Sequence, residues 1–425
     1  MSSEKRRIDE LLEVTSSKRI HMADYVPFGI PFYRGKEVIE RAKGNAISTE
    51  LFITSEQHRE IKRKFGSPQD GDILLTSVGT LGVPYYVFGD GEFYFKDGNV
   101  TWFRNFNAEI DSKFLFYWLS SPATQRRLDE ISIGSTQRAL TISALKSLEI
   151  DLPCISTQQM IVRVLDAVTD RIALLRETNA TLEAIAQALF KSWFVDFDPV
   201  HAKARGEPPQ GMDDATAALF PDSFEESDLG MVPKGWRVGS IYDIASVIYG
   251  APFASKKFNT ENLGIPLIRI RDLKSENPGV YTEEIHPKGY LVQPGDLVVG
   301  MDGEFRAYIW GGTPAWLNQR VCVFMPKGDY SSAYVNYTIK PQLASVEATE
   351  TATTVIHLGK NDIDHFKSII PDTTILKLFS EITSPIYSKI VEGKLKAQTL
   401  AQLRDTLLPK LISGQLRLPE AEELP

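Results

Sequence analysis

Apolar residues recur at seven-residue spacing through a long segment in the middle of the chain. One set consists of Ile161, Val168, Leu175, Leu182 and Leu189, and the complementary set consists of Leu165, Ile172, Asn179, Ala186 and Trp193. Because heptad spacing places a narrow apolar stripe along one side of a helix, it predicts a coiled-coil type of helix over 156–193. A helix of ~37 residues is roughly 55 Å long, which suits a spacer better than a domain core.

A second apolar stripe lies near the carboxyl end of the chain. It consists of Phe379, Ile386, Ile390, Ala397, Leu400, Leu407 and Leu411, with Gly393 and Arg404 as interruptions. The pattern predicts another long helix over 372–415, and two such stripes can bury each other. The alternative is a pair of core helices within one larger domain.

The segment before each helix has a different pattern. Residues 20–153 and 237–371 contain β-branched and aromatic runs broken by Gly, Pro and Asn, as in GDILLTSVG and GDLVVGMDG. Such runs predict short strands and turns. The sequence therefore predicts an α+β chain, with a mixed, mostly β domain over 1–155, another over 236–371, and two long helices.

The two halves of the chain resemble each other. GIPFYR at 29–34 corresponds to GIPLIR at 264–269, and GDIL at 71–74 corresponds to GDLV at 295–298. From Pro153, which matches Pro371, a constant offset leads to Leu189 and its match Leu407. Collinear matches over most of both halves indicate an internal repeat of one module.

The composition is that of globular domains, with 43% hydrophobic and 24% charged residues and a net charge of −8. Most of the excess acid lies in 194–235, where three Lys and Arg stand against nine Asp and Glu. The rest of the chain is therefore close to neutral. This composition permits binding to a nucleic acid, whose phosphates would repel a strongly acidic protein, but does not require it. This acidic, Pro- and Gly-rich segment is predicted to be an ordered but irregular connector, and 416–425 a frayed tail.

Targeting and redox features are plain. No apolar run approaches the ~18 residues that span a bilayer, and the start, MSSEKRRIDELLEV, lacks the apolar region of a secretory signal. Cys154 and Cys322 stand far apart without a CxxC pair, which indicates reduced side chains. We therefore expect a soluble, cytoplasmic protein that does not bind membranes.

Several motifs resemble those of the type I restriction-modification specificity subunits. The segment ALFKSWFVDFDP at 188–199 is similar to the central conserved region of that family, and LGMVPKGW at 229–236 is similar to the lead into its second recognition domain. DLPCISTQQ at 151–159 resembles the entry to the conserved helix, with departures at Cys154 and Thr157. The resemblance extends over about residues 20–420.

The resemblance implies two target-recognition domains separated by two long antiparallel helices, related by a pseudo-twofold repeat. It implies double-stranded DNA, two methylation subunits and motor-nuclease subunits as partners. S-adenosylmethionine, ATP and magnesium would bind to those partners, and no catalytic, cofactor or metal site is expected in this chain. We expect the helical stripes to contact the methylation subunits through Leu175, Leu182, Leu189, Trp193, Phe194, Phe197, Leu400, Leu407 and Leu411.

Two other function classes remain as alternatives, a metal-dependent nuclease and a coiled-coil scaffold that does not read DNA. Pro371-Asp372 followed by Glu392-Gly393-Lys394 satisfies a loose nuclease pattern, but Asp372 and Glu392 would lie about 30 Å apart along one helix. A methyltransferase is disfavoured because the chain has neither an Asn/Asp-Pro-Pro-aromatic motif nor a GxGxxG loop. His357 and His365 are most simply surface or cap residues.

Polar and basic residues in the loops of the two β-rich domains are the candidate DNA contacts. In the first domain they are Arg34, Lys36, Lys62, Arg63, Lys64, Thr76, Ser77, Thr80, Asn99, Thr101, Gln137 and Arg138. In the second they are Arg269, Arg271, Asp302, Glu304, Arg306, Asn318, Gln319 and Arg320. Each has a plainer alternative as a turn cap or a solvated surface residue. Two readers on a helical spacer predict a bipartite site whose half-site centres lie about one duplex turn apart.

Overall fold

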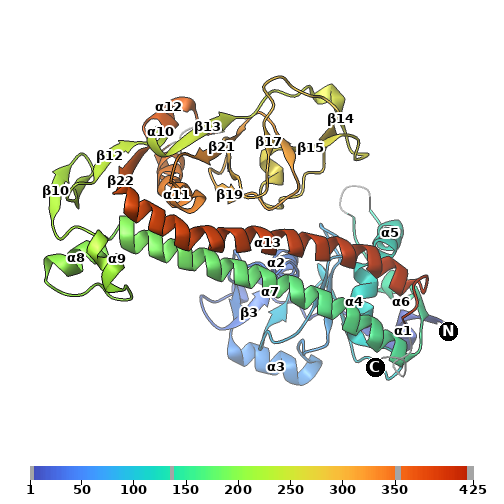
Figure 1. The fold of residues 1–425 in the computed structure, drawn as a ribbon. Helices are drawn as coiled ribbons and strands as arrows, with labels where there is room; N and C mark the ends of the chain where they lie inside the picture. Colours follow the sequence, from blue (N-terminus) through green and yellow to red (C-terminus); the bar gives the residue numbers. More distant parts are fainter. Residues whose placement is uncertain (1–3, 135–137, 350–355, 419–425) are drawn as a thin grey trace, which may run out of the picture. The chain divides into compact units, whose positions relative to one another are not determined.

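The computed structural model describes residues 4–134, 138–349 and 356–418. The chain divides into two compact units, which we call unit 1 (residues 1–170 with 401–425) and unit 2 (residues 171–400). Each unit combines a strand-rich part with a portion of each of the two long helices, α7 and α13 (Figure 1). The chain therefore returns to unit 1 after completing unit 2.

Unit 1 is built on a four-stranded antiparallel sheet in the order β2-β8-β5-β6 and a three-stranded sheet in the order β4-β3-β7. The strands are β2 (Glu13–Thr15), β3 (Ile30–Tyr33), β4 (Phe52–Ile53), β5 (Ile73–Thr76), β6 (Pro84–Tyr86), β7 (Tyr94–Phe95) and β8 (Val100–Arg104), while β1 (Glu4–Arg7) pairs with β9 (Glu149–Leu152). The helices are α1 (Ile8–Leu11), α2 (Gly35–Ala42), α3 (Ser55–Phe65), α4 (Ser112–Ser120), α5 (Pro122–Ile131) and α6 (Ile142–Lys146).

Unit 2 has the corresponding sheets, in the orders β13-β21-β18-β19 and β14-β16-β15-β20-β17. Its strands are β13 (Ala245–Tyr249), β14 (Phe258–Asn259), β15 (Ile265–Ile268), β16 (Tyr281–Thr282), β17 (Leu291–Val292), β18 (Leu297–Gly300), β19 (Ala307–Ile309), β20 (Ala315–Leu317) and β21 (Val321–Pro326), while β12 (Arg237–Ser240) pairs with β22 (Lys367–Ile370). The helices are α10 (Ile241–Ile244), α11 (Ser332–Thr349) and α12 (Lys360–Asp364).

The repeat predicted from the sequence is also a repeat of topology. In each unit a central antiparallel sheet pairs its strands in the same sequence order, and a parallel pair, β3 with β7 or β15 with β20, lies in the second sheet. The α+β class and the duplicated module are therefore confirmed.

The repeated Gly-Asp pair closes the same turn in both units. Gly71 and Gly295 have φ of 94° and 100°, a region that other residues rarely adopt. In unit 1 the Asp72 carboxylate accepts from the backbone N–H of Gln69 (2.9 Å), and in unit 2 the Asp296 carboxylate accepts from that of Gln293 (2.8 Å). The conformational demand of this turn explains why the motif occurs in both halves.

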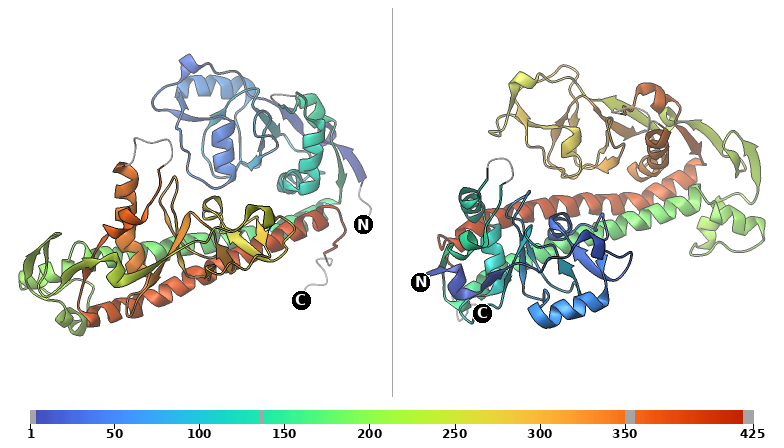
Figure 2. Two further views of the ribbon diagram at one scale, coloured as in Figure 1. Left: turned by 90° about the horizontal axis from the view of Figure 1, so that it is seen from above. Right: turned by 180° about the vertical axis from the view of Figure 1, so that it is seen from behind.

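The two long helices are α7 (Ile155–Phe194) and α13 (Thr373–Ile412). The sequence predicted them over 156–193 and 372–415. Within unit 2 they lie side by side in every view (Figures 1 and 2). Trp193 of α7 contacts Phe379 of α13. Asn179 lies fourteen residues before Trp193 on α7, and it contacts Gly393, which lies fourteen residues after Phe379 on α13. One helix therefore runs against the direction of the other.

The contact between Asn179 and Gly393 is a close one. Asn179 Nδ2 donates to the carbonyl of Ile390 at 3.1 Å, and a Cβ added to Gly393 would lie 2.4 Å from Asn179 Oδ1. Gly393, an interruption of the apolar stripe in the sequence, instead provides the space that the asparagine side chain occupies. A polar residue in such a seam selects one register of the two helices.

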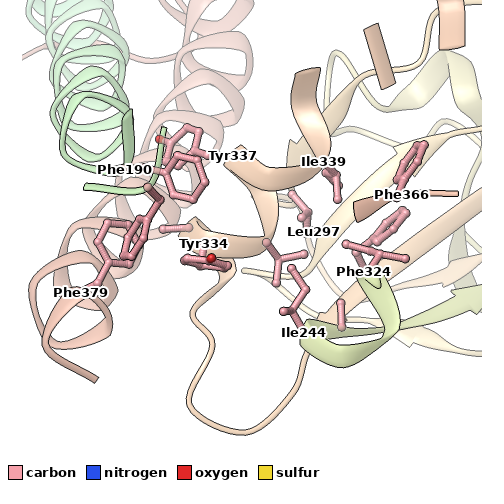
Figure 3. Packing of buried hydrophobic residues seen from close by; sticks show 14 of the residues in the cluster. Phe190, Ile244, Leu297, Phe324, Tyr334, Tyr337, Ile339, Phe366 and Phe379 are labelled. Atoms are coloured by element: carbon pink, nitrogen blue, oxygen red, sulfur yellow. The ribbon is translucent and has the colours of Figure 1, made fainter. Parts of the chain in front are cut away.

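Aromatic side chains join the ends of α7 and α13 to the strand-rich part of unit 2. Phe190 packs against Tyr334 and Tyr337 of α11 and against Phe379 of α13, as Figure 3 shows. Phe194 lies in the same cluster, with ring centroids 5.0 Å from Phe379. This core fixes the strand-rich part of unit 2 to both helices.

Three predicted subunit-interface residues are corrected by this packing. Trp193 and Phe194 are 4% and 3% exposed within the unit 2 core, and Leu411 is 2% exposed within the unit 1 core. Their apolar surface is buried by their own chain and is not available to a partner. Other predicted contacts are half-buried: Leu182, Leu189 and Phe197 against the unit 2 core, Leu407 against the unit 1 core, and Leu175 and Leu400 on the helices.

The connector is more regular than predicted. It contains α8 (Asp198–Ala204), α9 (Asp214–Leu219) and a hairpin of β10 (Phe224–Ser227) with β11 (Gly230–Pro233). Val200, Phe220 and Trp236 are buried in the unit 2 core and anchor it. The acidic and Pro/Gly-rich composition concealed these widely spaced apolar anchors.

We predict that Gly393→Ala lowers the free energy of unfolding by about 1–3 kcal/mol, because the new methyl group would overlap Asn179. Alanine otherwise favours a helix over glycine by about 1 kcal/mol, so Asn179→Ala/Gly393→Ala should be more stable than Gly393→Ala alone. Denaturant unfolding measures both. Gly35→Ala is the control, because a Cβ there meets open space. Equal losses for the single and double variants would contradict this role of the close contact.

Candidate nucleic-acid interface

Three segments that are far apart in the sequence of unit 1 meet at one end of its central sheet. The backbone N–H of Ser77, just after β5, donates to the carbonyl of Asn99 at 2.8 Å. The N–H of Leu140, before α6, donates to the carbonyl of Ser77 at 2.9 Å, and Val78 forms a β-bridge with Ala139. The predicted candidates at 76–80, 99–101 and 138 are therefore neighbours in space.

Unit 2 brings together the corresponding segments by the same hydrogen bonds. The N–H of Met301 donates to the carbonyl of Arg320 at 2.9 Å, and the N–H of Leu358 donates to that of Met301 at 2.8 Å. Asp302 forms the matching β-bridge with His357. We call these two places convergent ends.

Several candidates at the convergent ends turn out to be buried, which corrects their prediction as DNA contacts. Thr76, Ser77 and Thr101 are at most 3% exposed. Thr76 Oγ1 accepts from the N–H of Val83 at 3.0 Å, and the Ser77 and Thr101 hydroxyl oxygens lie 2.6 Å apart. These hydroxyls hold neighbouring strands together and cannot reach a base edge. Asn318 in unit 2 is 9% exposed, and its burial likewise corrects its prediction as a DNA contact.

The remaining unit 1 candidates at this end differ in their exposure and in whether the protein already binds their side chains. Thr80 is exposed and Asn99 is half-buried. Arg138 is exposed but donates to Ser132 Oγ at 2.8 Å and pairs with Asp129 at 3.2 Å. Gln137 lies outside the described residues.

In unit 2 the convergent end carries a cluster of charged side chains. Asp302 Oδ1 lies 2.6 Å from His357 Nδ1 and 3.6 Å from Arg320 Nη1. Glu304 and Gln319 are exposed beside it, and Arg306 forms an ion pair with Glu347. From the sequence His357 is predicted to be a surface or cap residue, because the 55 residues that separate it from Asp302 conceal this contact.

The two repeated arginines have structural partners. Arg34 donates to Glu37 through Nη2 at 2.6 Å, and Arg269 donates to Asp272 through Nε at 2.9 Å. Both carboxylates are buried and also accept from the arginine's own backbone N–H, so each arginine closes the start of a helical turn. This favours the structural role over a phosphate contact. Lys36 and Arg271 are exposed beside them.

The basic run in α3 is partly neutralised. Lys62 pairs with Glu92 at 2.5 Å, and Lys64 pairs with Glu60. His58 points inward, and its burial lowers the pKa of the imidazole. Of the three phosphate candidates there, Arg63 is exposed and has no ion pair within the described part of the chain.

The residues of the loose nuclease pattern do not converge. Asp372 accepts from the backbone N–H of Thr374 at the start of α13. Glu392 pairs with Lys389 and Lys396, which hold its pKa at about 2, and Lys394 pairs with Glu276 at 2.6 Å. Among the described residues no group of three or more His, Cys, Asp or Glu is placed to hold a metal ion.

Two sequence expectations concern the chain as a whole. Cys154 and Cys322 are both free thiols, as predicted. No helix in the described ranges is both long enough and apolar enough to cross a membrane.

Comparison with protein families gives a match to the type I restriction modification DNA specificity domain. The match covers residues 2–184 and 233–399, so each copy includes the strand-rich part of one half.

Individual relatives agree with that match. The chain is 28% identical over 362 residues to the specificity subunit of the type I restriction enzyme MjaIX from Methanocaldococcus jannaschii, covering 82% of this chain and 78% of the relative. It is 27% identical over 419 residues to that of the enzyme HindI from Haemophilus influenzae, covering 81% and 86%. The fold is similar to a crystal structure of the S subunit of a type I restriction-modification system from M. genitalium, with a TM-score of 0.53, 17% identity and coverage of 96% and 95%.

We predict that Ser77→Ala lowers the free energy of unfolding by about 1–2 kcal/mol, because it leaves the buried Thr101 hydroxyl without this partner. Adding Thr101→Val should restore part of the loss, since both polar groups are then removed. Thr80→Ala, at an exposed position three residues away, is the control in the same denaturant series. A Ser77→Ala variant as stable as Thr80→Ala would show that the hydroxyl pair is unimportant.

Proposed function

Because this chain belongs to the type I restriction-modification DNA specificity family, we propose that it is the subunit that reads a bipartite DNA sequence for a type I complex. In this proposal unit 1 reads one half-site and unit 2 reads the other. The chain supplies sequence recognition and a scaffold for assembly, and the chemistry belongs to its partners.

The observation that carries the proposal is the duplicated convergent end. The same three backbone segments meet in both units, yet the side chains that they present differ. Val78 and Ala139 in unit 1 stand where unit 2 has Asp302 and His357. A common frame with different exposed groups suits two readers of different base sequences.

We propose two methylation subunits and additional motor-nuclease subunits as protein partners. Apolar side chains that remain exposed on the long helices are the candidate contacts. On α7, Leu174 and Ile185 are 49% and 52% exposed, and their spacing of eleven residues places them on one helix face. On α13, Ile382 and Leu403 are 40% and 45% exposed.

In this arrangement S-adenosylmethionine, ATP and magnesium bind to the partner subunits, and the complex works in the cytoplasm. A nuclease in this chain is disfavoured because Asp372, Glu392 and Lys394 each have a separate structural role on α13. A scaffold that does not read DNA gives no reason for two copies of the convergent end.

Expression of the chain with its methylation subunits should direct adenine methylation to one bipartite sequence, made of two short half-sites and an unread spacer. Mapping of methylated adenines with and without this gene measures both half-sites. The purified chain alone should neither methylate DNA with S-adenosylmethionine nor cleave it with magnesium. Methylation without sequence preference, or cleavage by the chain alone, would refute the proposal.

Leu174→Asp/Ile185→Asp should weaken assembly with the methylation subunits at least tenfold, because a charged group would replace apolar surface at the centre of the contact. The measurement is the dissociation constant of the complex. Gln187→Asp introduces the same group on an exposed position of another face of α7 and is the control. Equal effects of the two changes would place the contact elsewhere.

A further inference from the structure

Three side chains at the convergent end of unit 2 form a connected cluster, which we call the reading triad: Asp302, Arg320 and His357. His357 Nδ1 lies 2.6 Å from Asp302 Oδ1 and 3.1 Å from Arg320 Nη1, while Arg320 Nη1 lies 3.6 Å from Asp302 Oδ1. The guanidinium group of Arg320 and the imidazole of His357 therefore converge on one carboxylate from two separate segments of the chain.

The short contact decides which nitrogen of the imidazole carries a proton. A carboxylate oxygen can only accept, so His357 Nδ1 donates to Asp302, and Arg320 Nη1, which can only donate, makes no hydrogen bond to the same nitrogen. The opposite tautomer would place a lone pair against the carboxylate at 2.6 Å. In the neutral ring, Nε2 is then held as an acceptor.

The outer atoms of the triad remain available. The side chains of Arg320 and His357 are 55% and 44% exposed, whereas that of Asp302 is 27% exposed. In the described structure, His357 Nε2 and the Arg320 Nε and Nη2 groups make no hydrogen bond or ion pair with the protein. The Asp302 carboxylate is thus covered by Arg320 and His357. The imidazole Nε2 and the guanidinium Nε and Nη2 of these two residues are available to a ligand.

The backbone at Arg320 is strained, which a plain surface ion pair does not explain. Arg320 has a φ of 71°, a region that non-glycine residues rarely adopt. Exposed ion pairs contribute little to stability, so the pair does not offset this cost. Strained residues of this kind concentrate at binding sites, where the surrounding structure holds them. Here the carbonyl of Arg320 accepts from Met301, next to Asp302.

We propose that Arg320 and His357 read base edges of one half-site, while Asp302 acts as a positioning residue that does not touch DNA. This inference rests on the proposed function. The free edge of the Arg320 guanidinium suits the two acceptors of guanine, N7 and O6, in the major groove. The Nε2 acceptor of His357 suits the amino group of adenine or cytosine in a neighbouring base pair. Unit 1 has no such triad at Val78 and Ala139, so it reads its half-site by other groups.

The test uses the chain assembled with its methylation subunits, after the wild-type complex has given the bipartite sequence. Each base pair of the site is then varied in a binding and methylation panel. Arg320→Ala should lose about 5- to 100-fold of the discrimination at one guanine, and His357→Ala should do the same at an adjacent base pair, both in one half-site. The other half-site should keep its preference.

An analogue separates direct reading from an indirect effect. Replacement of that guanine by 7-deazaguanine removes N7 and should weaken binding of the wild-type complex by about fivefold or more, but should add little to the effect of Arg320→Ala. Independent effects of the two changes would refute guanine reading by Arg320.

Asp302→Asn tests the positioning role, because the amide can still accept from His357 but no longer pairs with Arg320. It should reduce discrimination at the arginine position more than at the histidine position. Lys360→Ala, which removes a 69% exposed charge three residues from His357, is the control and should leave base preference unchanged.

A wild-type bipartite site with unchanged preferences in every triad variant would refute the triad and leave the proposed function intact. Uniformly weaker binding to all sequences would also refute it, since phosphate contacts alone behave in that way. A wild-type complex without any sequence preference would refute the proposed function itself.

Discussion

The seam between α7 and α13 is the interaction on which the rest of this protein depends. Neither unit has a complete core without it. The unit 1 core contains Ile161 and Leu165 of α7 together with Leu408 and Leu411 of α13, and the unit 2 core contains Phe190 and Ile390 from the same two helices. Each helix thus contributes residues to both cores. Within unit 2, the polar contact of Asn179 with Gly393 and the Ile390 carbonyl favours the observed register of the two helices.

The division of roles along the chain follows from this constraint. Residues that the family resemblance associates with assembly, such as Trp193 and Phe194, are used to bury the ends of the helices within unit 2. The apolar side chains that stay exposed on α7 are at other positions, such as Leu174 and Ile185, which are the proposed partner contacts.

The fold could be predicted largely because its signals are local or periodic. Heptad spacing gave both helices, and repeated turns such as Gly71-Asp72 and Gly295-Asp296 gave the duplication. Gly393 was predicted to weaken the apolar stripe. Its role is to leave space for Asn179, which is distant in the sequence. The connector was predicted to be ordered, but its helices and hairpin were missed because a few buried aromatics, such as Phe220, outweigh an acidic composition.

The candidate site was predicted less completely. The three segments of each convergent end could be named from loops and polar residues, but polarity does not distinguish a buried strand-to-strand hydroxyl, as at Thr101, from an exposed contact. The structural role of Arg34 could not be predicted either. Its partner Glu37 accepts from both the side chain and the backbone N–H of Arg34, and only the structure shows these hydrogen bonds. His357 became significant only through its distance to Asp302.

The proposed function makes one central prediction, that the paired helices set the spacing between the two half-sites. Insertion of one heptad into each helix, after Asp170 in α7 and after Leu400 in α13, preserves the apolar stripes and lengthens the pair by about 10 Å. Mapping of methylated adenines should then show both half-sites unchanged and the unread spacer longer by about one to three base pairs, at ~3.4 Å per base pair. Altered half-sites with the original spacer would contradict the account.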